Sequence, residues 1–328
     1  MTRLIRVTGP DDSALREAAE ILQAGGLVAF PTETVYGLGA DGLNPEAVAR
    51  IYAAKGRPAT NPVILHVADL ASALPLVAQW PGSAGTLAER YWPGPLTLVL
   101  PASAVVPAIV RAGGPTVALR CPAHPVAQAL LRAVGRPLAA PSANRSQHLS
   151  PTLAEHVVSS LGEAVDLILD AGPTAAGLES TILDLSGSRP RILRPGPIKP
   201  AQLAAILGPV DIWEGAAEQG VRQDAPGMAE RHYAPRARLS LVAPGAGLDQ
   251  SPGATAYVAF DALPALPTGV RGVLLPLDAE VVAARLYALL HELDEAGFER
   301  IVMEWPPEGE AWLAIRDRLQ RASFHKQP

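Results

Sequence analysis

The chain has 328 residues, which exceeds what one hydrophobic core usually serves, so two domains are expected. Hydrophobic residues make up 48% of the chain and charged residues 18%, a balance that excludes disorder of the whole chain. The net charge of -5 argues against a protein whose entire surface binds nucleic acid, but it is compatible with a local basic pocket.

The first part of the chain predicts two helices on either side of a short strand. The apolar periodicity of residues 13–24 predicts a helix, and residues 27–30 (LVAF) predict a buried strand. Residues 44–55 predict the second helix, because Asn44 is a favourable N-cap and Gly56 suits the left-handed position beyond the last turn.

Helices and strands then alternate with short loops as far as residue 207. Further helices are predicted near 83–91, 125–134, 152–161 and 197–207. Further strands are predicted at 63–67, 96–100, 117–119, 167–170, 180–185 and 191–194. This order predicts an α/β or α+β sheet with helices on its faces.

The periodic pattern breaks over residues 208–236, which predicts a linker between a domain of residues 1–207 and a domain of residues 237–328. In the second domain the sequence pattern predicts strands that alternate with helices. The strands are predicted at 239–244, 255–260, 271–277 and 300–305, and the helices at 279–296 and 309–321. Such alternation predicts a small parallel, Rossmann-like α/β domain.

Basic and polar residues gather where these elements end. Lys55 and Arg57 straddle a glycine after the second helix, and a lysine point charge beside an arginine fork suits a polyphosphate. Asn61 and His66 could add neutral donors. Thr34 lies in the glycine-containing segment PTETVYGLGADG (31–42), directly after a buried strand. The alternatives are a tight turn for the threonine segment and a solvated basic turn for the lysine segment.

Three later segments add candidate anion ligands. Arg120 ends an apolar strand and would suit the carboxylate of an amino acid, or else a buried ion pair with an acidic residue of the chain. Ser142, Asn144 and Ser150 make the loop at 140–152 rich in donors for phosphate, or else a helix-capping loop. With Ser180 and Arg194 at other strand ends, the cations of these segments predict one focused positive cavity.

Several other classes are excluded or disfavoured. The chain has no GxxxxGK[ST] loop, no complete GxGxxG and no HExxH. A nucleophilic pair of Cys121 and His124 is disfavoured, because a thiolate needs a specific electropositive site. No protein-bound metal is expected, so any Mg²⁺ would come with ATP. The absence of a signal peptide and of an apolar run of about 18 residues predicts a cytoplasmic protein without membrane spans.

Seven segments in order carry a resemblance to a known family: FPTETVYGLG, KGRPATNPVILH, WPGPLTLVL, TVALRCP, APSANRS, ESTILDL and RILRPG. They resemble the YrdC-like threonylcarbamoyl-AMP synthases, and PGMAERHYAP (226–235) before a further domain resembles the long, two-domain form. The resemblance implies a twisted mixed α/β sheet with flanking helices and a concave positive cavity. It also implies condensation of L-threonine, bicarbonate or CO₂ and ATP to threonylcarbamoyl-adenylate with release of pyrophosphate. The product would serve t6A modification of tRNA position 37 through a separate tRNA threonylcarbamoyltransferase.

The resemblance also implies roles for individual residues. On the L-threonine side it implies Thr34, His66, Arg120, the backbone of Ala140, and Ser180. On the ATP side it implies Lys55, Arg57, Asn61, Thr116, Ser142, Asn144, Ser150, Arg194 and Tyr233. It implies that the linker covers the site, with His232 in the lid. No residue is expected to act as an obligatory general acid or base.

Three alternatives stay open at this point. The same positive cavity could bind tRNA or double-stranded RNA weakly. The chain could instead transfer a carbamoyl group from carbamoyl phosphate without consuming ATP, or it could sense an amino acid and use its C-terminal domain as an output. Pyrophosphate release distinguishes the synthase from all three.

Overall fold

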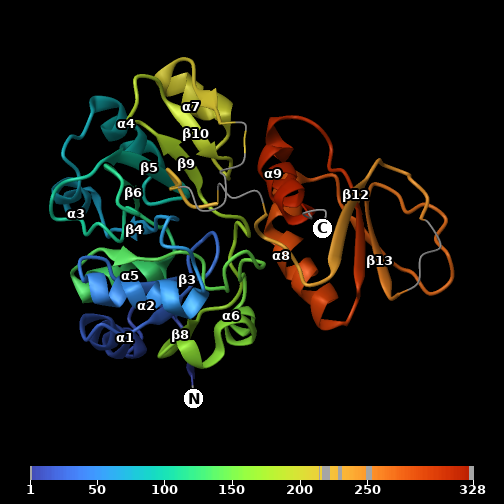
Figure 1. The fold of residues 1–328 in the computed structure, drawn as a ribbon, viewed down its shortest axis with the longest axis horizontal. Helices are drawn as coiled ribbons and strands as arrows, with labels where there is room; N and C mark the ends of the chain where they lie inside the picture. Colours follow the sequence, from blue (N-terminus) through green and yellow to red (C-terminus); the bar gives the residue numbers. More distant parts are fainter. Residues whose placement is uncertain (1, 214, 216–221, 228–230, 249–252, 325–328) are drawn as a thin grey trace.

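The computed structural model describes all residues except 1, 214, 216–221, 228–230, 249–252 and 325–328. The described strands form an 11-stranded mixed sheet in a large N-terminal lobe and a 4-stranded parallel sheet in a small C-terminal lobe. Figure 1 shows the two lobes side by side, the larger in blue to yellow and the smaller in orange to red.

The large sheet is built from strands far apart in the chain. In spatial order they are β1 (Arg3–Arg6), β8 (Leu167–Asp170), β2 (Val28–Phe30), β3 (Gly37–Asp41), β7 (Leu138–Ala139), β4 (Ile64–His66), β6 (Thr116–Arg120), β5 (Leu96–Pro101), β9 (Thr181–Asp184), β10 (Arg191–Arg194) and β11 (Asp211–Ile212). The β4–β6 pair is parallel and places His66 opposite Arg120. The antiparallel β5–β6 pair places Thr97 on the other side of Arg120. The sheet thus gathers the ends of β4, β6 and β9 in one region.

Helices flank this sheet, and their bounds agree well with the prediction except for the short helix at 70–73, which was not predicted. They are α1 (Ala14–Gln23), α2 (Pro45–Lys55), α3 (Leu70–Ala73), α4 (Gly82–Tyr91), α5 (Pro125–Val134), α6 (Ala154–Leu161) and α7 (Pro200–Leu207). The predicted caps of α2 are confirmed. The Asn44 side chain accepts hydrogen bonds from the backbone amides of the first turn at 3.0 and 3.2 Å, and Gly56 has φ 60°.

Four strands of the sheet were not predicted: β1, β3, β7 and β11. β1 lies at one edge, and β11 lies at the other, within the segment 208–236 that was expected to be a linker; parts of that segment lie outside the described residues. β3 occupies the end of the segment expected to be a tight turn. A Cβ on Gly39 would lie 2.8 Å from the ring of Phe30, so glycine here permits close pairing of β3 with β2.

The small lobe has the predicted parallel sheet, ordered β12 (Arg238–Val242), β15 (Arg300–Glu304), β13 (Thr255–Phe260) and β14 (Arg271–Leu275). Its helical elements are α8 (Ala279–Glu295), η3 (Glu310–Trp312) and α9 (Leu313–Ala322). The predicted inward face of α8 is confirmed, because Val282, Leu286, Leu289, Leu290 and Leu293 are all buried. No helix among the described residues has both the length and the apolar content needed to span a bilayer.

The lobes meet through α8, η3 and α9, and Figure 1 shows α8 and α9 between the small sheet and the large lobe. His291 on α8 bonds the carbonyl of Ser150 at 3.2 Å, and its ring stacks on that of His156 with centroids 3.7 Å apart. Glu310 accepts a hydrogen bond from the backbone amide of Ala201 at 2.6 Å. The small lobe is therefore attached to the large lobe by polar contacts as well as by ring stacking.

The stacked histidines predict that the protein loses stability in mild acid. Burial lowers the pKa of His156 to about 3 and that of His291 to about 4, so both stay neutral in the folded state. Unfolding exposes them to protonation below about pH 6.5. The contribution of these histidines to the free energy of unfolding is therefore largest above pH 6.5 and decreases as the pH drops toward 4. For a well-buried histidine the decrease between pH 6.5 and pH 5 is about 2 kcal/mol.

Urea unfolding at pH 7.5 and pH 5.0 measures this loss. The double variant His156→Gln, His291→Gln should lose markedly less stability than wild type across that window, whereas His148→Gln, at an exposed histidine, should behave as wild type. Equal stability of the wild-type protein at both pH values would contradict the prediction.

Candidate active site

A small cavity lies where the strand ends of the large sheet meet the segment that leads to the small lobe. It is lined by Thr32, Thr34, Val35, Gly37, Arg57, Ile64, His66, Arg120, Ala140, Pro141, Ser142, Glu179, Arg194, Pro226, Gly227, His232 and Tyr233. The cavity measures about 40 Å³. Ligand pockets usually measure about 300–1,000 Å³, so this cavity is smaller than a typical ligand pocket.

Four of the five residues predicted on the L-threonine side line the cavity: Thr34, His66, Arg120 and Ala140. Thr34 is held by a hydrogen bond of 2.8 Å between its hydroxyl and that of Thr32. Burial, with the nearby charge of Arg120, lowers the pKa of His66 to about 3, so the imidazole is neutral. This wall combines one cation with neutral hydrogen-bonding groups, which suits a zwitterionic amino acid and its carbamate.

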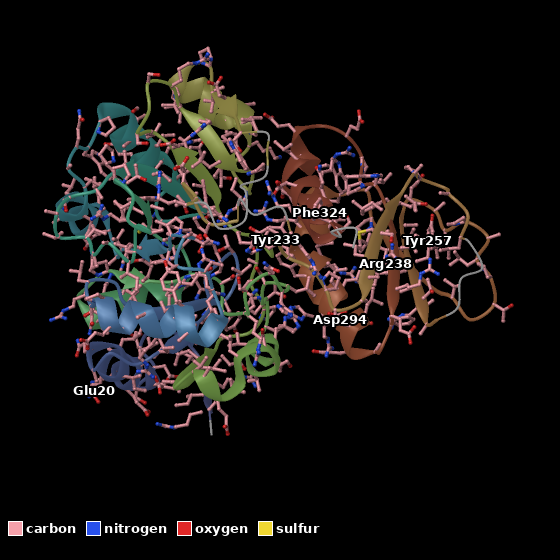
Figure 2. All side chains as sticks on the ribbon, viewed as in Figure 1. Glu20, Tyr233, Arg238, Tyr257, Asp294 and Phe324 are labelled. Atoms are coloured by element: carbon pink, nitrogen blue, oxygen red, sulfur yellow. The ribbon has the colours of Figure 1, made fainter. Side chains whose placement is uncertain are left out.

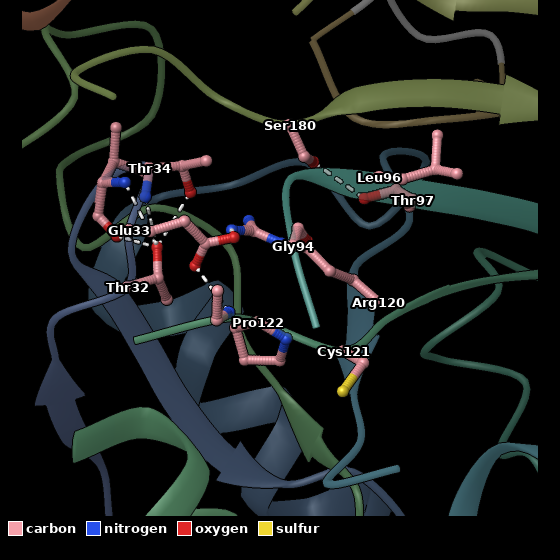
Figure 3. A network of polar contacts seen from close by, with 12 residues as sticks. Thr32, Glu33, Thr34, Gly94, Leu96, Thr97, Arg120, Cys121, Pro122 and Ser180 are labelled. Carbon is pink, nitrogen blue, oxygen red and sulfur yellow. Dashed lines mark hydrogen bonds and ion pairs between the residues drawn. The ribbon is translucent and has the colours of Figure 1, made fainter. Parts of the chain in front are cut away.

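Arg120 is paired with a carboxylate of the chain itself. Its Nη2 lies 2.7 Å from Oε1 of Glu33, and the other oxygen of Glu33 accepts from the Ala123 amide at 3.0 Å. Figure 3 shows the carboxylate of Glu33 facing the guanidinium group of Arg120. The sequence left a ligand carboxylate and a protein carboxylate open as partners of Arg120, and in this structure the partner is the protein carboxylate of Glu33.

Ser180 was predicted to face L-threonine, but it does not line the cavity. Its hydroxyl pairs with that of Thr97 at 2.7 Å and accepts from Nη2 of Arg194 at 3.0 Å. The backbone carbonyl of Ser180 also accepts from Nε of Arg194 at 3.1 Å. In this conformation Ser180 therefore orients Arg194.

Of the residues predicted on the ATP side, Arg57, Ser142, Arg194 and Tyr233 line the cavity. Arg57 is fixed by three acceptors, the carbonyls of Asn61 and Pro62 and the side-chain oxygen of Asn61, at 2.6–3.1 Å. Burial lowers the pKa of Arg57 to about 10, which still leaves it charged near neutral pH. Arg57 is thus a preorganised cation at the wall of the cavity.

Lys55 and Asn61 stand behind this wall. Nζ of Lys55 donates to the carbonyl of Ser142 at 2.6 Å and to that of Asn144. Burial, reinforced by Arg57, lowers the pKa of this amine. In this conformation Lys55 supports the loop that carries Ser142 and does not reach the cavity, while Asn61 holds Arg57.

Three further ATP-side candidates lie off the cavity. Asn144 donates to the carbonyls of Arg145 and His148, both at 2.8 Å. Ser150 donates to Glu179 at 2.5 Å. Thr116 begins β6, whose other end carries Arg120. The helix-capping alternative for the loop at 140–152 is wrong, because α6 begins after Leu153 without a side-chain cap.

The two residues predicted in the segment that covers the site lie at the cavity. His232 and Tyr233 both line it, together with Pro226 and Gly227. Tyr233 is 1% exposed and has φ 61°, a left-handed conformation that is uncommon outside glycine. Figure 2 shows it between the two lobes. A Cβ on Gly227 would lie 2.3 Å from the Tyr233 hydroxyl, so this close approach requires glycine.

Glu33, Glu179 and Arg318 were not predicted as site residues. Glu33 and Glu179 each stand beside a predicted residue in the chain, in PTETVYG and GLESTILDL, so a carboxylate next to a candidate donor was an available signal. Arg318 lies on α9, where no motif distinguished it. Cys121 is buried, which raises the pKa of its thiol and disfavours a thiolate nucleophile.

Two family models together span most of the chain. Residues 20–196 match the Sua5/YciO/YrdC model, described as "Telomere recombination". Residues 198–323 match the model described as "Threonylcarbamoyl-AMP synthase, C-terminal domain". The two matches meet close to the start of α7, after the last strand that borders the cavity.

Full-length relatives and a solved structure resemble both lobes. The threonylcarbamoyl-AMP synthase of Bacillus subtilis (strain 168) is 41% identical over 331 residues, which cover 95% of this chain and 94% of that protein. The threonylcarbamoyl-AMP synthase of Pyrococcus abyssi is 39% identical, with 95% and 94% covered. The crystal structure of P. abyssi Sua5 complexed with L-threonine aligns with a TM-score of 0.89 at 37% identity and covers 98% of this chain and 97% of that chain.

Proposed function

The chain belongs to the Sua5/YciO/YrdC family, and from this membership we propose that it is a threonylcarbamoyl-AMP synthase of the nucleotidyltransferase class. It would condense L-threonine, bicarbonate and ATP to threonylcarbamoyl-adenylate and release pyrophosphate, for t6A modification of tRNA. The observation that carries the proposal is the convergence of Arg57, Arg120 and Arg194, from distant segments, on one cavity. A positively charged hollow of this kind suits a polyphosphate beside an amino-acid carboxylate.

The chemistry needs positioning more than a protein nucleophile. The amine of L-threonine takes up CO₂ and releases a proton to give a carbamate. A carbamate oxygen then attacks the α-phosphorus of ATP, the bond from that phosphorus to the bridging oxygen of the β-phosphate breaks, and pyrophosphate leaves with the electron pair. Negative charge grows on the phosphoryl oxygens and on the leaving group. Arg57 and Arg194 would stabilise that charge, while Arg120 would orient the amino acid.

We propose that Mg²⁺ enters with ATP. Among the described residues, no group of three or more His, Cys, Asp or Glu side chains could hold a metal ion. The phosphate oxygens of ATP would therefore coordinate the ion. When bound, the ion would neutralise phosphate charge. The tight, lid-covered cavity would exclude water from the labile adenylate.

The proposal extends to the surroundings of the reaction. A mixed anhydride of a carbamate and AMP hydrolyses readily, so a tRNA threonylcarbamoyltransferase in the same compartment would have to consume it. The single cysteine fits a reducing cytoplasm, which is where we place the protein. Weak binding of tRNA would be secondary to this activity.

Pyrophosphate release tests the function directly. With ATP, bicarbonate and L-threonine the wild-type protein should release pyrophosphate and form threonylcarbamoyl-adenylate, which mass spectrometry detects. Omission of any substrate or chelation of Mg²⁺ with EDTA should reduce the rate by at least about tenfold. Binding of L-threonine or tRNA without pyrophosphate release would reject the synthase in favour of a sensor or an RNA-binding protein.

A further inference from the structure

Arg318 on α9 belongs to the small lobe, yet its side chain reaches the large one. It is 0% exposed. Nε donates to Oε2 of Glu179 at 2.8 Å, and Nη2 donates to the carbonyl of Pro195 at 2.9 Å. Its guanidinium also lies over the ring of Tyr233, 4.9 Å from the centroid. One side chain of the small lobe thus contacts both the lid and the wall of the candidate active site.

These contacts flank Arg194, which lines the cavity, and Ser180, which orients it. Glu179 directly precedes Ser180, and Pro195 directly follows Arg194. Ser180 and Arg194 are themselves joined by hydrogen bonds of 3.0 and 3.1 Å. Arg318 therefore holds the immediate neighbours of both partners, and it fixes the local backbone from which Arg194 extends.

Glu179 places a buried negative charge at the cavity wall. Burial alone would raise its pKa, but the charges of Arg318 and Arg194 and the hydrogen bond from Ser150 lower the pKa to about 2. The carboxylate is thus ionised at neutral pH. Because an unpaired carboxylate here would repel phosphate groups and attract Arg194, the site needs a cation that neutralises it without facing the ligand.

We infer that Arg318 is a positioning residue for the nucleotide, which neutralises Glu179 so that Arg194 stays available to the ATP phosphates. The inference rests on the proposed function and assigns the small lobe a part in it. The geometry supports this because Arg318 does not line the cavity, whereas Glu179 and Arg194 do. The hydroxyl of Tyr287 on α8 donates to the same carboxylate at 3.2 Å, so α8 and α9 each contribute a hydrogen-bond donor to Glu179.

ATP titration of Arg318→Met by calorimetry tests the inference. We expect the Kd for ATP to rise at least about tenfold, because the unpaired carboxylate of Glu179 would then attract Arg194 away from the phosphates. The Kd for L-threonine should stay within about threefold of wild type. Arg316→Met is the matched control on the same helix. Arg316 stacks on Trp305 and bonds the carbonyl of Pro306, both within the small lobe, so its loss should leave ATP binding unchanged.

Adding Glu179→Gln to Arg318→Met separates charge from packing. If Arg318 acts through the charge of Glu179, the double variant should bind ATP within about threefold of wild type, since no unpaired carboxylate remains. A merely structural role of Arg318 would not be rescued by this second substitution. Unchanged ATP affinity in Arg318→Met, or no rescue in the double variant, would overturn the inference.

Arg318→Lys covers the case in which the methionine variant does not fold. It keeps the positive charge but loses the bond to the Pro195 carbonyl, and it should bind ATP within about threefold of wild type. A tenfold loss in this variant would count against the charge argument. Failure of the proposed function looks different, because the wild-type protein itself would then neither bind ATP nor release pyrophosphate.

Discussion

Replacing Arg57 with methionine is expected to weaken ATP binding roughly 10- to 150-fold and to leave L-threonine affinity almost unchanged. Arg57 is a buried cation whose three acceptors hold it against the cavity wall before any ligand arrives. A charge-assisted hydrogen bond contributes about 1.5–3 kcal/mol, and methionine keeps the apolar stem of the side chain while removing the charge. Calorimetric titration with each ligand measures the two affinities separately.

The matching substitution at the predicted L-threonine site completes this test. Arg120→Met should weaken L-threonine binding by a similar factor and ATP binding much less, because Arg120 lies beside His66, among the residues predicted to bind L-threonine. Arg50→Met is the control, since Arg50 is an exposed arginine of α2 that pairs with Asp166 at the surface. Equal losses of both ligands in both arginine variants would contradict the division of the cavity into a nucleotide half and an amino-acid half.

Local signals were enough to predict most of the fold. The helix α2 was predicted with correct ends because its caps are encoded within the segment itself, in Asn44 and Gly56. β3 was missed because two of its five residues are glycines, which resemble a turn until the pairing with β2 is known. β11 was missed because two residues that pair only at the sheet edge carry no periodic signal.

The site shows the same limit more sharply. Motif order correctly identified segments that meet at one cavity, but not which way each side chain points. Lys55 is the last residue of α2, a position that suits phosphate binding, yet its amine turns inward to two carbonyls of the loop at 142–144. Arg318 gave no signal at all, because a buried arginine and a surface arginine on an amphipathic helix look alike until the opposing lobe is in place.

The lid carries the second large expected effect. His232→Ala with Tyr233→Ala is expected to reduce formation of threonylcarbamoyl-adenylate at least tenfold, since their rings close a cavity of about 40 Å³ against water. The ring of Tyr233 is packed between the ring of His232, with centroids 4.0 Å apart, and the ring of Tyr287, with centroids 6.1 Å apart. Removal of the Tyr233 ring should therefore open the cavity from the side of the small lobe. Because a cavity of this volume is smaller than a typical ligand pocket, we expect His232 and Tyr233 to shift when substrates enter.

The mechanism of this loss can be read from two products measured together. In the wild-type protein, pyrophosphate and threonylcarbamoyl-adenylate should appear in equal amounts. In the lid variant, pyrophosphate should exceed the adenylate, because water reaches the anhydride or the α-phosphorus before the product is protected. Tyr257→Ala is the control, since it removes an equally buried tyrosine ring from the small sheet, remote from the cavity, and should preserve the equal ratio. Equal product and pyrophosphate in the lid variant would show that His232 and Tyr233 do not exclude water, and the closed cavity would then have to be explained by packing alone.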